Sequence, residues 1–273
     1  MKESNPTIKE VLKEASLMLQ SQKEAAILLA HYLKCDRLRL LTHEDEKIKN
    51  PGDYFALVKR RLAHEPVEYI TNTVSFYSED FYIAPGALIP RPETELLIDK
   101  AKEIIHKEKI TKIAEIGTGS GIIAVMLAYL FPHLEIVATD ISKDALKIAQ
   151  VNAKNKAVSD RIHFIHTSYL EGINQNFDMI ISNPPYIAED FELEKPLSFE
   201  PQNALFGGIR GDEMLCDIID IASERKRGYL LCEMGYDQKI PLENYMKQKG
   251  IRKISFYKDY CGFDRGFVAD LKE

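Results

Sequence analysis

Cysteine is scarce in this chain of 273 residues, and tryptophan is absent. The four cysteines are scattered, at Cys35, Cys216, Cys232 and Cys261. No two of them form a Cys-x-x-Cys pair, which argues against a zinc site and against a disulfide framework. We therefore expect no metal, and reduced thiols of the kind found in cytosolic proteins.

Long apolar runs and an excess of basic residues are also missing. No stretch approaches the length of a transmembrane helix, and Met1-Lys2-Glu3-Ser4-Asn5 does not begin a signal peptide. The predicted location is the cytoplasm, without membrane contact. The 36 Lys and Arg residues against 42 Asp and Glu leave a net charge of −6, which argues against a general nucleic-acid binder.

The first part of the chain is predicted to be helical. Thr7 and Ser21 each precede a glutamate by three residues, the spacing of a capping box, and apolar residues at helical spacing follow both. A third helix is predicted over 54–63, and β-rich pieces over 71–76 and 81–83. We interpret residues 1–66 as a small helical domain that docks a partner, and residues 67–90 as a β-hairpin linker.

Strands and helices alternate through the rest of the chain, residues 91–273. Alternation of this kind predicts an α/β domain with a doubly wound sheet, in which ligands bind at the carboxyl ends of the strands. Helices are expected at 92–107, 121–131, 142–155, 212–225 and 238–249. Seven strands are expected, the last two without a helix between them, at 112–116, 135–139, 162–165, 177–181, 229–233, 253–257 and 266–270.

A glycine-rich turn, "AEIGTGSG", follows the first of these strands. Its glycines permit a tight turn and a close approach by a ligand, although a purely structural turn is the alternative. The dinucleotide fingerprint Gly-x-Gly-x-x-Gly would need a glycine at Ile122. The pattern instead resembles motif I of class I S-adenosylmethionine-dependent methyltransferases. That resemblance implies a cofactor site at Glu115, Gly117, Thr118, Gly119, Ser120 and Gly121.

Asp140 ends the next strand, about twenty residues beyond the glycines. A carboxylate there can accept hydrogen bonds from ribose hydroxyls, and the alternative is an N-cap for the helix that begins near Ser142. After the third strand, Ser168 takes the place where many such enzymes have an acidic residue near the adenine. Tyr169 could lie against the adenine ring or could be ordinary packing.

The stretch "SNPPYI" follows the fourth strand. Two successive prolines remove two backbone donors and fix two φ angles, so the segment is stiff and its carbonyls are available to accept hydrogen bonds. Asn183-Pro184-Pro185-Tyr186 resembles motif IV of methyltransferases that act on a planar nitrogen, either a glutamine amide or the amine of adenine. That resemblance implies that Asn183 and Pro184 accept hydrogen bonds from the target nitrogen, that Tyr186 stacks on it, and that all four residues form the catalytic and substrate site, with Asn183 also beside the cofactor.

Three further stretches, "LIPRPETE" (88–95), "FEPQNALFGG" (199–208) and "DYCGFDRGFVADL" (259–271), extend the match. With the helical front part, the chain resembles the release factor glutamine methyltransferases almost end to end. The resemblance implies methylation of the glutamine in the Gly-Gly-Gln motif of peptide chain release factors, with Arg91 and Thr94 as candidate substrate-binding residues. A ribosomal-protein glutamine, an adenine in DNA, and a non-catalytic binding role remain alternatives. We expect a monomer with no direct DNA substrate, because no basic groove is evident.

Overall fold

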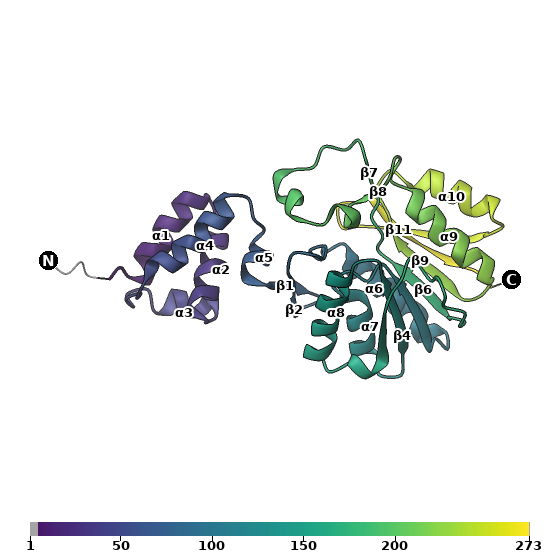
Figure 1. Cartoon of the computed structure of the whole chain (residues 1–273), viewed down its shortest axis with the longest axis horizontal. Coiled ribbons are helices and arrows are strands. Elements are labelled where there is room, and N and C mark those ends of the chain that lie inside the picture. The colour runs from purple at the N-terminus through teal and green to yellow at the C-terminus, as the bar shows by residue number, and fades with distance from the viewer. Residues whose placement is uncertain (1–4, 273) are drawn as a thin grey trace. The chain divides into compact units, whose positions relative to one another are not determined.

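The computed structural model describes residues 5–272. The start of the chain, where the sequence predicts no signal peptide, lies outside the described residues from Met1 to Ser4. Two compact units are present (Figure 1). The first runs to Thr73 and includes Glu194–Phe199, and the second contains the remainder from Val74. Among the described residues, no helix is both long enough and apolar enough to cross a membrane.

Five helices form the first unit. They are α1 (Ile8–Leu19), α2 (Gln22–Leu33), α3 (Arg37–Thr42), α4 (Pro51–Leu62) and α5 (Val67–Thr71). The capping box that the sequence predicts at Thr7 is present, with the Glu10 N–H donating to Thr7 Oγ1 and the Glu10 carboxylate accepting from Thr7 N–H. The unit has a hydrophobic core of its own, which includes Ile8, Leu28 and Tyr54.

The short elements of this unit differ from the prediction. Helices α3 and α5 were not predicted, because five or six residues are too few to show a helical period. The strand predicted from Thr71 is wrong at its start: Thr71 ends α5, Asn72 adopts φ 54°, and strand β1 begins at Thr73. Helix α4 begins at Pro51, because proline is favourable in the first helical turn.

The second unit contains the predicted seven-stranded sheet, which confirms the α/β doubly wound fold. Its spatial order is β10-β11-β9-β6-β3-β4-β5, with β11 antiparallel to both neighbours and the central strands parallel. The strands are β3 (Lys112–Ile116), β4 (Glu135–Asp140), β5 (Ile162–His166), β6 (Met179–Ser182), β9 (Tyr229–Glu233), β10 (Lys253–Lys258) and β11 (Asp264–Asp270).

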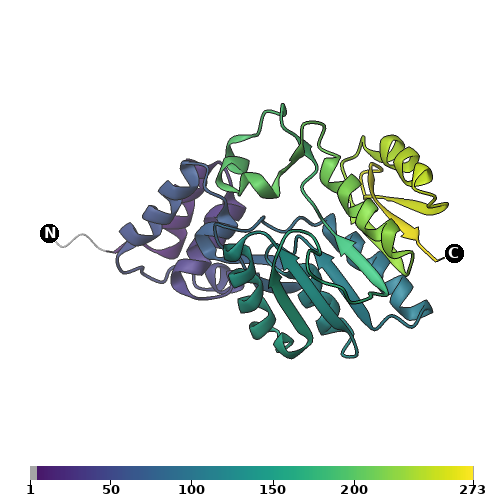
Figure 2. The same ribbon diagram turned by 45° about the vertical axis from the view of Figure 1, so that its right-hand side comes forward.

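Helices cover both faces of this sheet (Figures 1 and 2). On one face lie α6 (Thr94–Lys107), α7 (Ile122–Leu130) and α8 (Lys143–Asn155), and on the other lie α9 (Glu213–Arg225) and α10 (Lys239–Gln248). Alternate residues of β3 point to opposite faces, and Ala114 and Ile116 belong to the same hydrophobic core cluster as residues of α9 and α10. Helix α6 begins at Thr94 rather than at residue 92, because residues 91–94 still form a turn, with Thr94 N–H donating to Arg91 O.

Smaller elements complete the second unit. β1 (Thr73–Phe76) and β2 (Glu79–Tyr82) form a hairpin, while β7 (Ile187–Ala188) and β8 (Phe206–Gly208) form an unpredicted parallel pair. Short 3-10 turns lie at Ser159–Arg161 and Gln202–Ala204, and another, Lys195–Phe199, belongs to the first unit. β4 and β6 flank β3 on opposite sides, so the direction of strand succession reverses at β3. Such a reversal opens a crevice at the carboxyl ends of the strands.

Candidate active site

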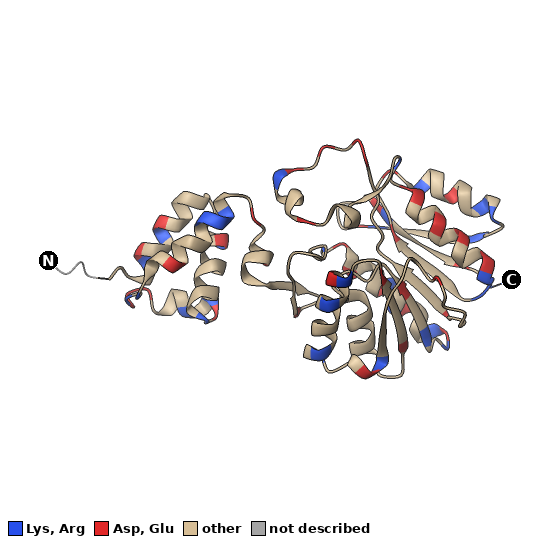
Figure 3. Cartoon of the chain, viewed as in Figure 1, with Lys and Arg blue, Asp and Glu red and all other residues tan. Residues whose placement is uncertain are grey.

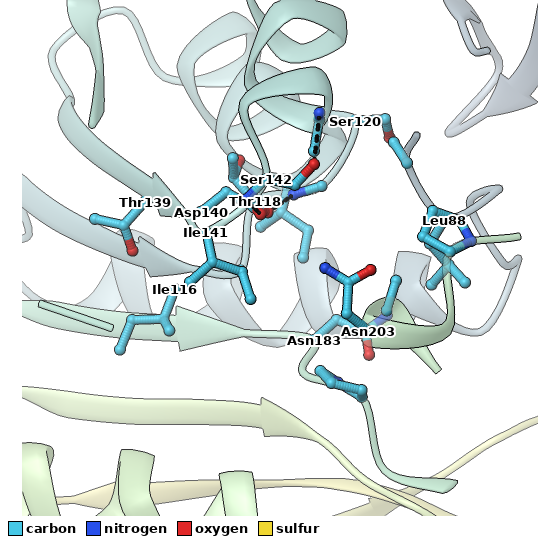
Figure 4. Close-up of a pocket in the computed structure, with 18 of the residues that line it drawn as sticks. Leu88, Ile116, Thr118, Ser120, Thr139, Asp140, Ile141, Ser142, Asn183 and Asn203 are labelled. Atoms are coloured by element: carbon cyan, nitrogen blue, oxygen red, sulfur yellow. Dashed lines mark hydrogen bonds between the residues drawn. The ribbon is translucent and has the colours of Figure 1, made fainter. Parts of the chain in front are cut away.

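A cavity of about 250 Å³ lies at this crevice (Figure 4). The ends of β3 and β4 and the residues that directly follow β5 and β6 contribute to its wall, and Asp140 and Asn183 lie on different sides of it in the view. Two lining side chains are charged, Arg91 and Asp140. Lining residues that the sequence had suggested as site residues are Arg91, Thr94, Gly117, Thr118, Gly119, Ser120, Asp140, Tyr169, Asn183 and Pro185.

The glycine turn presents bare backbone to the cavity. Gly117 and Gly119 have φ values of 70° and 56°, and a Cβ added to either would meet nothing within 4 Å. Gly121 differs, because a Cβ there would lie 2.7 Å from the Cβ of Ala149 in α8. The first two glycines therefore leave room on the cavity side, whereas the third permits the turn to pack against α8.

Glu115 lies beneath the turn and is not among the residues that line the cavity. Its Oε2 accepts hydrogen bonds from the Thr118 hydroxyl (2.7 Å) and from Ala124 N–H (3.1 Å). Oε1 is buried without a hydrogen-bond partner, and burial raises the pKa of Glu115 to about 8. The carboxyl group thus fixes the shape of the turn from behind, so any effect on a cofactor would be exerted through the turn.

Asp140 borders the cavity and is held by backbone donors. Its carboxylate accepts from Gly119 N–H and Ser142 N–H, both at 2.8 Å. The N-cap of α8 is Ser142, whose hydroxyl accepts from Ala145 N–H, so the alternative that Asp140 caps this helix is wrong. A carboxylate has about four acceptor positions, and two bonds leave capacity for a ligand.

Ser168 and Tyr169 also line the cavity. Tyr169 has φ 45°, an uncommon value for a non-glycine residue, and its hydroxyl donates to Asp217 Oδ2 at 2.7 Å. Burial, together with Asp217, raises the pKa of Tyr169. The ring is therefore fixed at the cavity wall by a residue of α9.

The Asn-Pro-Pro-Tyr segment leaves β6 at the opposite side of the cavity (Figure 4). Asn183 and Pro185 line the cavity, whereas Pro184 is buried. The Tyr186 ring packs against the core, and its hydroxyl donates to Glu233 Oε1 at 3.0 Å. Burial raises the pKa of Tyr186, and stacking of its ring on a substrate stays a prediction.

The backbone of this segment is supported from behind. A Cβ on Gly207 would lie 2.4 Å from Pro185 O, and one on Gly211 would lie 2.6 Å from Tyr186 O. Gln238 Nε2 donates to Tyr186 O at 3.0 Å. The close contact at Gly207 explains one of the two glycines that end "FEPQNALFGG", and Gly211 follows that stretch.

The two candidate substrate residues are engaged within the protein. Arg91 forms an ion pair at 2.5 Å with Glu200, a buried carboxylate that also accepts from Ile89 N–H. Thr94 Oγ1 donates to Glu233 Oε2 at 2.7 Å and accepts from Asn183 Nδ2 at 3.0 Å. Both residues shape the cavity wall through these contacts.

Glu200 and Glu233 were not selected from the sequence. The position of Glu233 in the sequence could have indicated a site residue. It is a charged residue at the end of an apolar strand, and so lies at the same edge of the sheet as Asp140. Glu200 lies in an irregular segment, where no period indicates which side chains are buried. Asn203, from the same segment, also lines the cavity.

Comparison with known proteins places the chain in one family. A family model described as Methyltransferase small domain matches residues 92–195, and another described as PrmC N-terminal domain matches residues 8–71. A release factor glutamine methyltransferase of Coxiella burnetii is 35% identical over 96% of this chain and 98% of its own length. A namesake from Koribacter versatilis is 38% identical over 82% of each chain.

The chain belongs to the release factor glutamine methyltransferase family. The resemblance read from the sequence is confirmed, and the protein is an S-adenosylmethionine-dependent methyltransferase.

Solved structures agree with the family at the level of the fold. The hMettl16 catalytic domain in complex with an RNA hairpin superposes with a TM-score of 0.59 at 16% identity, covering 71% of this chain and 76% of that chain. A ribosomal protein L11 methylase from Lactobacillus delbrueckii gives 0.52 at 22% identity, covering 70% and 84%. At such identities the likeness concerns the fold alone.

Proposed function

We propose that this protein methylates the side-chain amide nitrogen of the glutamine in the Gly-Gly-Gln motif of peptide chain release factors. The observation that carries the proposal is the position of Asn183. Its side chain borders the cavity with Nδ2 bonded to Thr94, so its oxygen is available to a ligand. The names of the relatives point to the same substrate.

S-adenosylmethionine fits the residues at the other side of the cavity. The open space in front of Gly117 and Gly119 would admit a ligand against the backbone, and Asp140 retains acceptor capacity for ribose hydroxyls. We propose that these residues, with Thr118, Ser120 and Gly121 of the same turn, hold the cofactor. We further propose that Tyr169 contacts its adenine and that Glu115 acts through the turn. When bound, the cofactor supplies a methyl group on a sulfonium.

The protein groups would act on the target amide by orienting it. An amide nitrogen is a poor nucleophile, because its lone pair is delocalised into the carbonyl. Asn183 Oδ1 and the Pro184 carbonyl can each accept one of its N–H hydrogens and thereby aim the nitrogen. The nitrogen becomes positive as it gains the methyl group, so both hydrogen bonds strengthen and stabilise the transition state. The nitrogen then releases to water a proton that has become acidic, and no strong base is required beforehand.

The alternatives remain distinguishable. Glutamine methylation of a ribosomal protein would use the same site. An adenine in DNA would need a basic groove for the phosphates, whereas α9 carries four acidic residues and a single basic one, Arg225, at its C-terminal end (Figure 3). We therefore propose that DNA is not a direct substrate. Separately, we propose that the protein acts as a monomer.

The test is transfer of a labelled methyl group from S-adenosylmethionine to intact release factor, a release factor whose Gly-Gly-Gln glutamine is replaced by alanine, ribosomal proteins and duplex DNA. We expect label in the intact release factor alone. Equal labelling of the alanine-substituted factor would contradict the target residue, and label in DNA would favour the adenine alternative.

We also propose that residues 1–66 dock the folded release factor, since a flexible loop offers few contacts, with 67–90 as the linker and 91–273 as the catalytic domain. Removal of residues 1–66 should raise KM for intact release factor more than KM for a short Gly-Gly-Gln peptide. Equal increases would contradict docking. Gel filtration of the full chain tests the monomer.

A further inference from the structure

Three polar side chains from distant parts of the second unit form one hydrogen-bonded row. Asn183 Nδ2 donates to Thr94 Oγ1 at 3.0 Å, and Thr94 Oγ1 donates to Glu233 Oε2 at 2.7 Å. Thr94 and Glu233 are each 1% exposed. The row therefore runs from the cavity wall at Asn183 into the interior, where water cannot replace a missing partner.

The direction of the hydrogen bonds in this row follows from Glu233. An ionised carboxylate only accepts, and a hydroxyl has a single hydrogen to donate. If the Thr94 hydrogen points to Glu233, then Thr94 Oγ1 can only accept from its other neighbour. The end of the Asn183 amide that faces Thr94 must therefore be the NH₂ group, and Oδ1 is turned away from Thr94.

The hydrogen-bond geometry places both oxygens of Glu233 as acceptors, with Oε2 accepting from Thr94 Oγ1 at 2.7 Å. Its second oxygen, Oε1, accepts from the Tyr186 hydroxyl at 3.0 Å, so both oxygens receive hydroxyl hydrogens. Burial raises the pKa of Glu233, and Glu93 adds to that increase, whereas the hydrogen bonds from Thr94 and Tyr186 and the Arg265 guanidinium act in the opposite direction. The Tyr257 hydroxyl, buried without a hydrogen-bond partner, is a further titratable group near this carboxylate.

The two ends of a side-chain amide have nearly the same shape, so packing alone does not select between them. If the Asn183 amide were rotated by 180°, its oxygen would face the accepting oxygen of Thr94 and its NH₂ would face the cavity. An NH₂ group there would oppose the N–H groups of an incoming amide. The row thus determines whether Asn183 attracts or repels the target.

We propose that Glu233, acting through Thr94, holds the Asn183 amide with its oxygen available to the substrate. This inference rests on the proposed function, and it makes Thr94 and Glu233 positioning residues for the reaction. Thr94 borders the cavity, but its one hydrogen is used by Glu233.

The test compares Thr94→Val, which keeps the shape but not the hydroxyl, with Thr94→Ser, which restores a hydroxyl. Thr94→Val should lower kcat for release factor by about 10- to 100-fold, the usual effect of losing a group that orients a site residue. KM and the affinity for S-adenosylhomocysteine should change by less than about twofold. Thr94→Ser should recover most of kcat. The control is Thr71→Val, which removes a buried hydroxyl that donates to Val67 O at 2.9 Å and should leave kcat unchanged.

A second measurement does not depend on activity. In protein with ¹⁵N-labelled asparagine, the Asn183 NH₂ group should exchange its hydrogens slowly with water, because one of the two is bonded to Thr94. They should exchange quickly in Thr94→Val and slowly again in Thr94→Ser. If Thr94→Val does not fold, Glu233→Gln replaces it. The introduced amide would donate to Thr94, and the same fall in kcat with unchanged cofactor affinity is expected.

Two failures are separable. A wild-type protein that leaves release factor unlabelled would contradict the proposed function, while the exchange rates would still report the orientation of Asn183. A wild-type protein that labels release factor, together with a Thr94→Val variant of equal kcat and equally slow Asn183 exchange, would overturn this inference.

Discussion

Replacement of Asn183 by aspartate should produce an enzyme that works better in acid than in base. The introduced carboxylate would place an acceptor about 3.0 Å from Thr94 Oγ1, whose only hydrogen is bonded to Glu233 at 2.7 Å. A buried acceptor without a donor costs about 1–3 kcal/mol. That cost corresponds to a pKa increase of about 1–2 units for the new carboxyl group, from an ordinary value of about 3.9 to about 5–6.

Protonation would restore the pattern of the original amide. The carboxylic acid O–H would donate to Thr94 as the Asn183 NH₂ does, and its carbonyl oxygen would be available to the substrate. At pH 8 we expect a rate about 10²–10³ below wild type, as for the loss of one preorganised hydrogen-bonding group. At pH values above the new pKa, lowering the pH by one unit should raise the protonated, active fraction of the enzyme about tenfold.

The assay is the initial rate of methyl transfer to release factor between pH 5.5 and 9, expressed relative to wild type at each pH. Asn183→Ala is the control, since it loses the acceptor and should show no recovery in acid. Adding Glu233→Gln to Asn183→Asp should recover activity at pH 8, because the new amide can donate to Thr94 and Thr94 can then donate to the carboxylate. Two results would refute this reasoning. One is a rate of Asn183→Asp, relative to wild type, that does not change with pH. The other is a double variant, Asn183→Asp with Glu233→Gln, that is no faster at pH 8 than Asn183→Asp alone.

Three other outcomes can be measured. Asp140→Ala should weaken S-adenosylhomocysteine binding by about 1–3 kcal/mol in calorimetry, and NAD, unlike S-adenosylhomocysteine, should not raise the melting temperature of the wild type; the reverse would contradict the cofactor site. Burial raises the pKa of Glu115 from 4.5 to about 8, so between these pH values the folded state holds a proton that the unfolded state has lost. The free energy of unfolding should therefore fall as pH rises through this window, by up to about 1.4 kcal/mol per pH unit. Urea titrations of Glu115→Gln should lack this contribution, and a variant whose stability changes with pH as the wild type does would contradict it. Gly121→Ala should lose about 2–5 kcal/mol of stability from overpacking against Ala149 and from its φ of 80°, and Ala149→Gly should restore part of that loss. Gly119→Ala should lose less, because a Cβ there meets nothing within 4 Å and only its φ of 56° is unfavourable; equal losses for the two variants would contradict this difference.

The sheet was predictable because each buried strand is a short run of apolar, often β-branched residues between turn signals. Strands β3 and β9 have the predicted limits, 112–116 and 229–233. β6 begins at Met179 rather than at residue 177, because Asp178 before it accepts hydrogen bonds from Thr111 and Lys112. A hydrophobicity pattern does not predict which polar side chain fixes the first residue of a strand.

The site was predictable only in part. Asp140 and Asn183 were found because they stand directly after strands and belong to motifs. Thr94, Asn183 and Glu233 lie far apart along the chain and meet only because α6, β6 and β9 converge at one end of the sheet. No local sequence pattern predicts that these three residues are in contact.

The glycine turn also constrains how this sequence can change over time. Gly117 and Gly119 adopt left-handed φ values in open space, where an asparagine could be tolerated at modest cost. Gly121 is opposed by Ala149, so a larger residue there would damage the fold itself. A descendant that no longer bound a cofactor could therefore lose the first two glycines by drift, while Gly121 and a small residue at position 149 would persist together. Among distant relatives, the third glycine alone would mark shared ancestry, and only the first two would mark a retained methyltransferase.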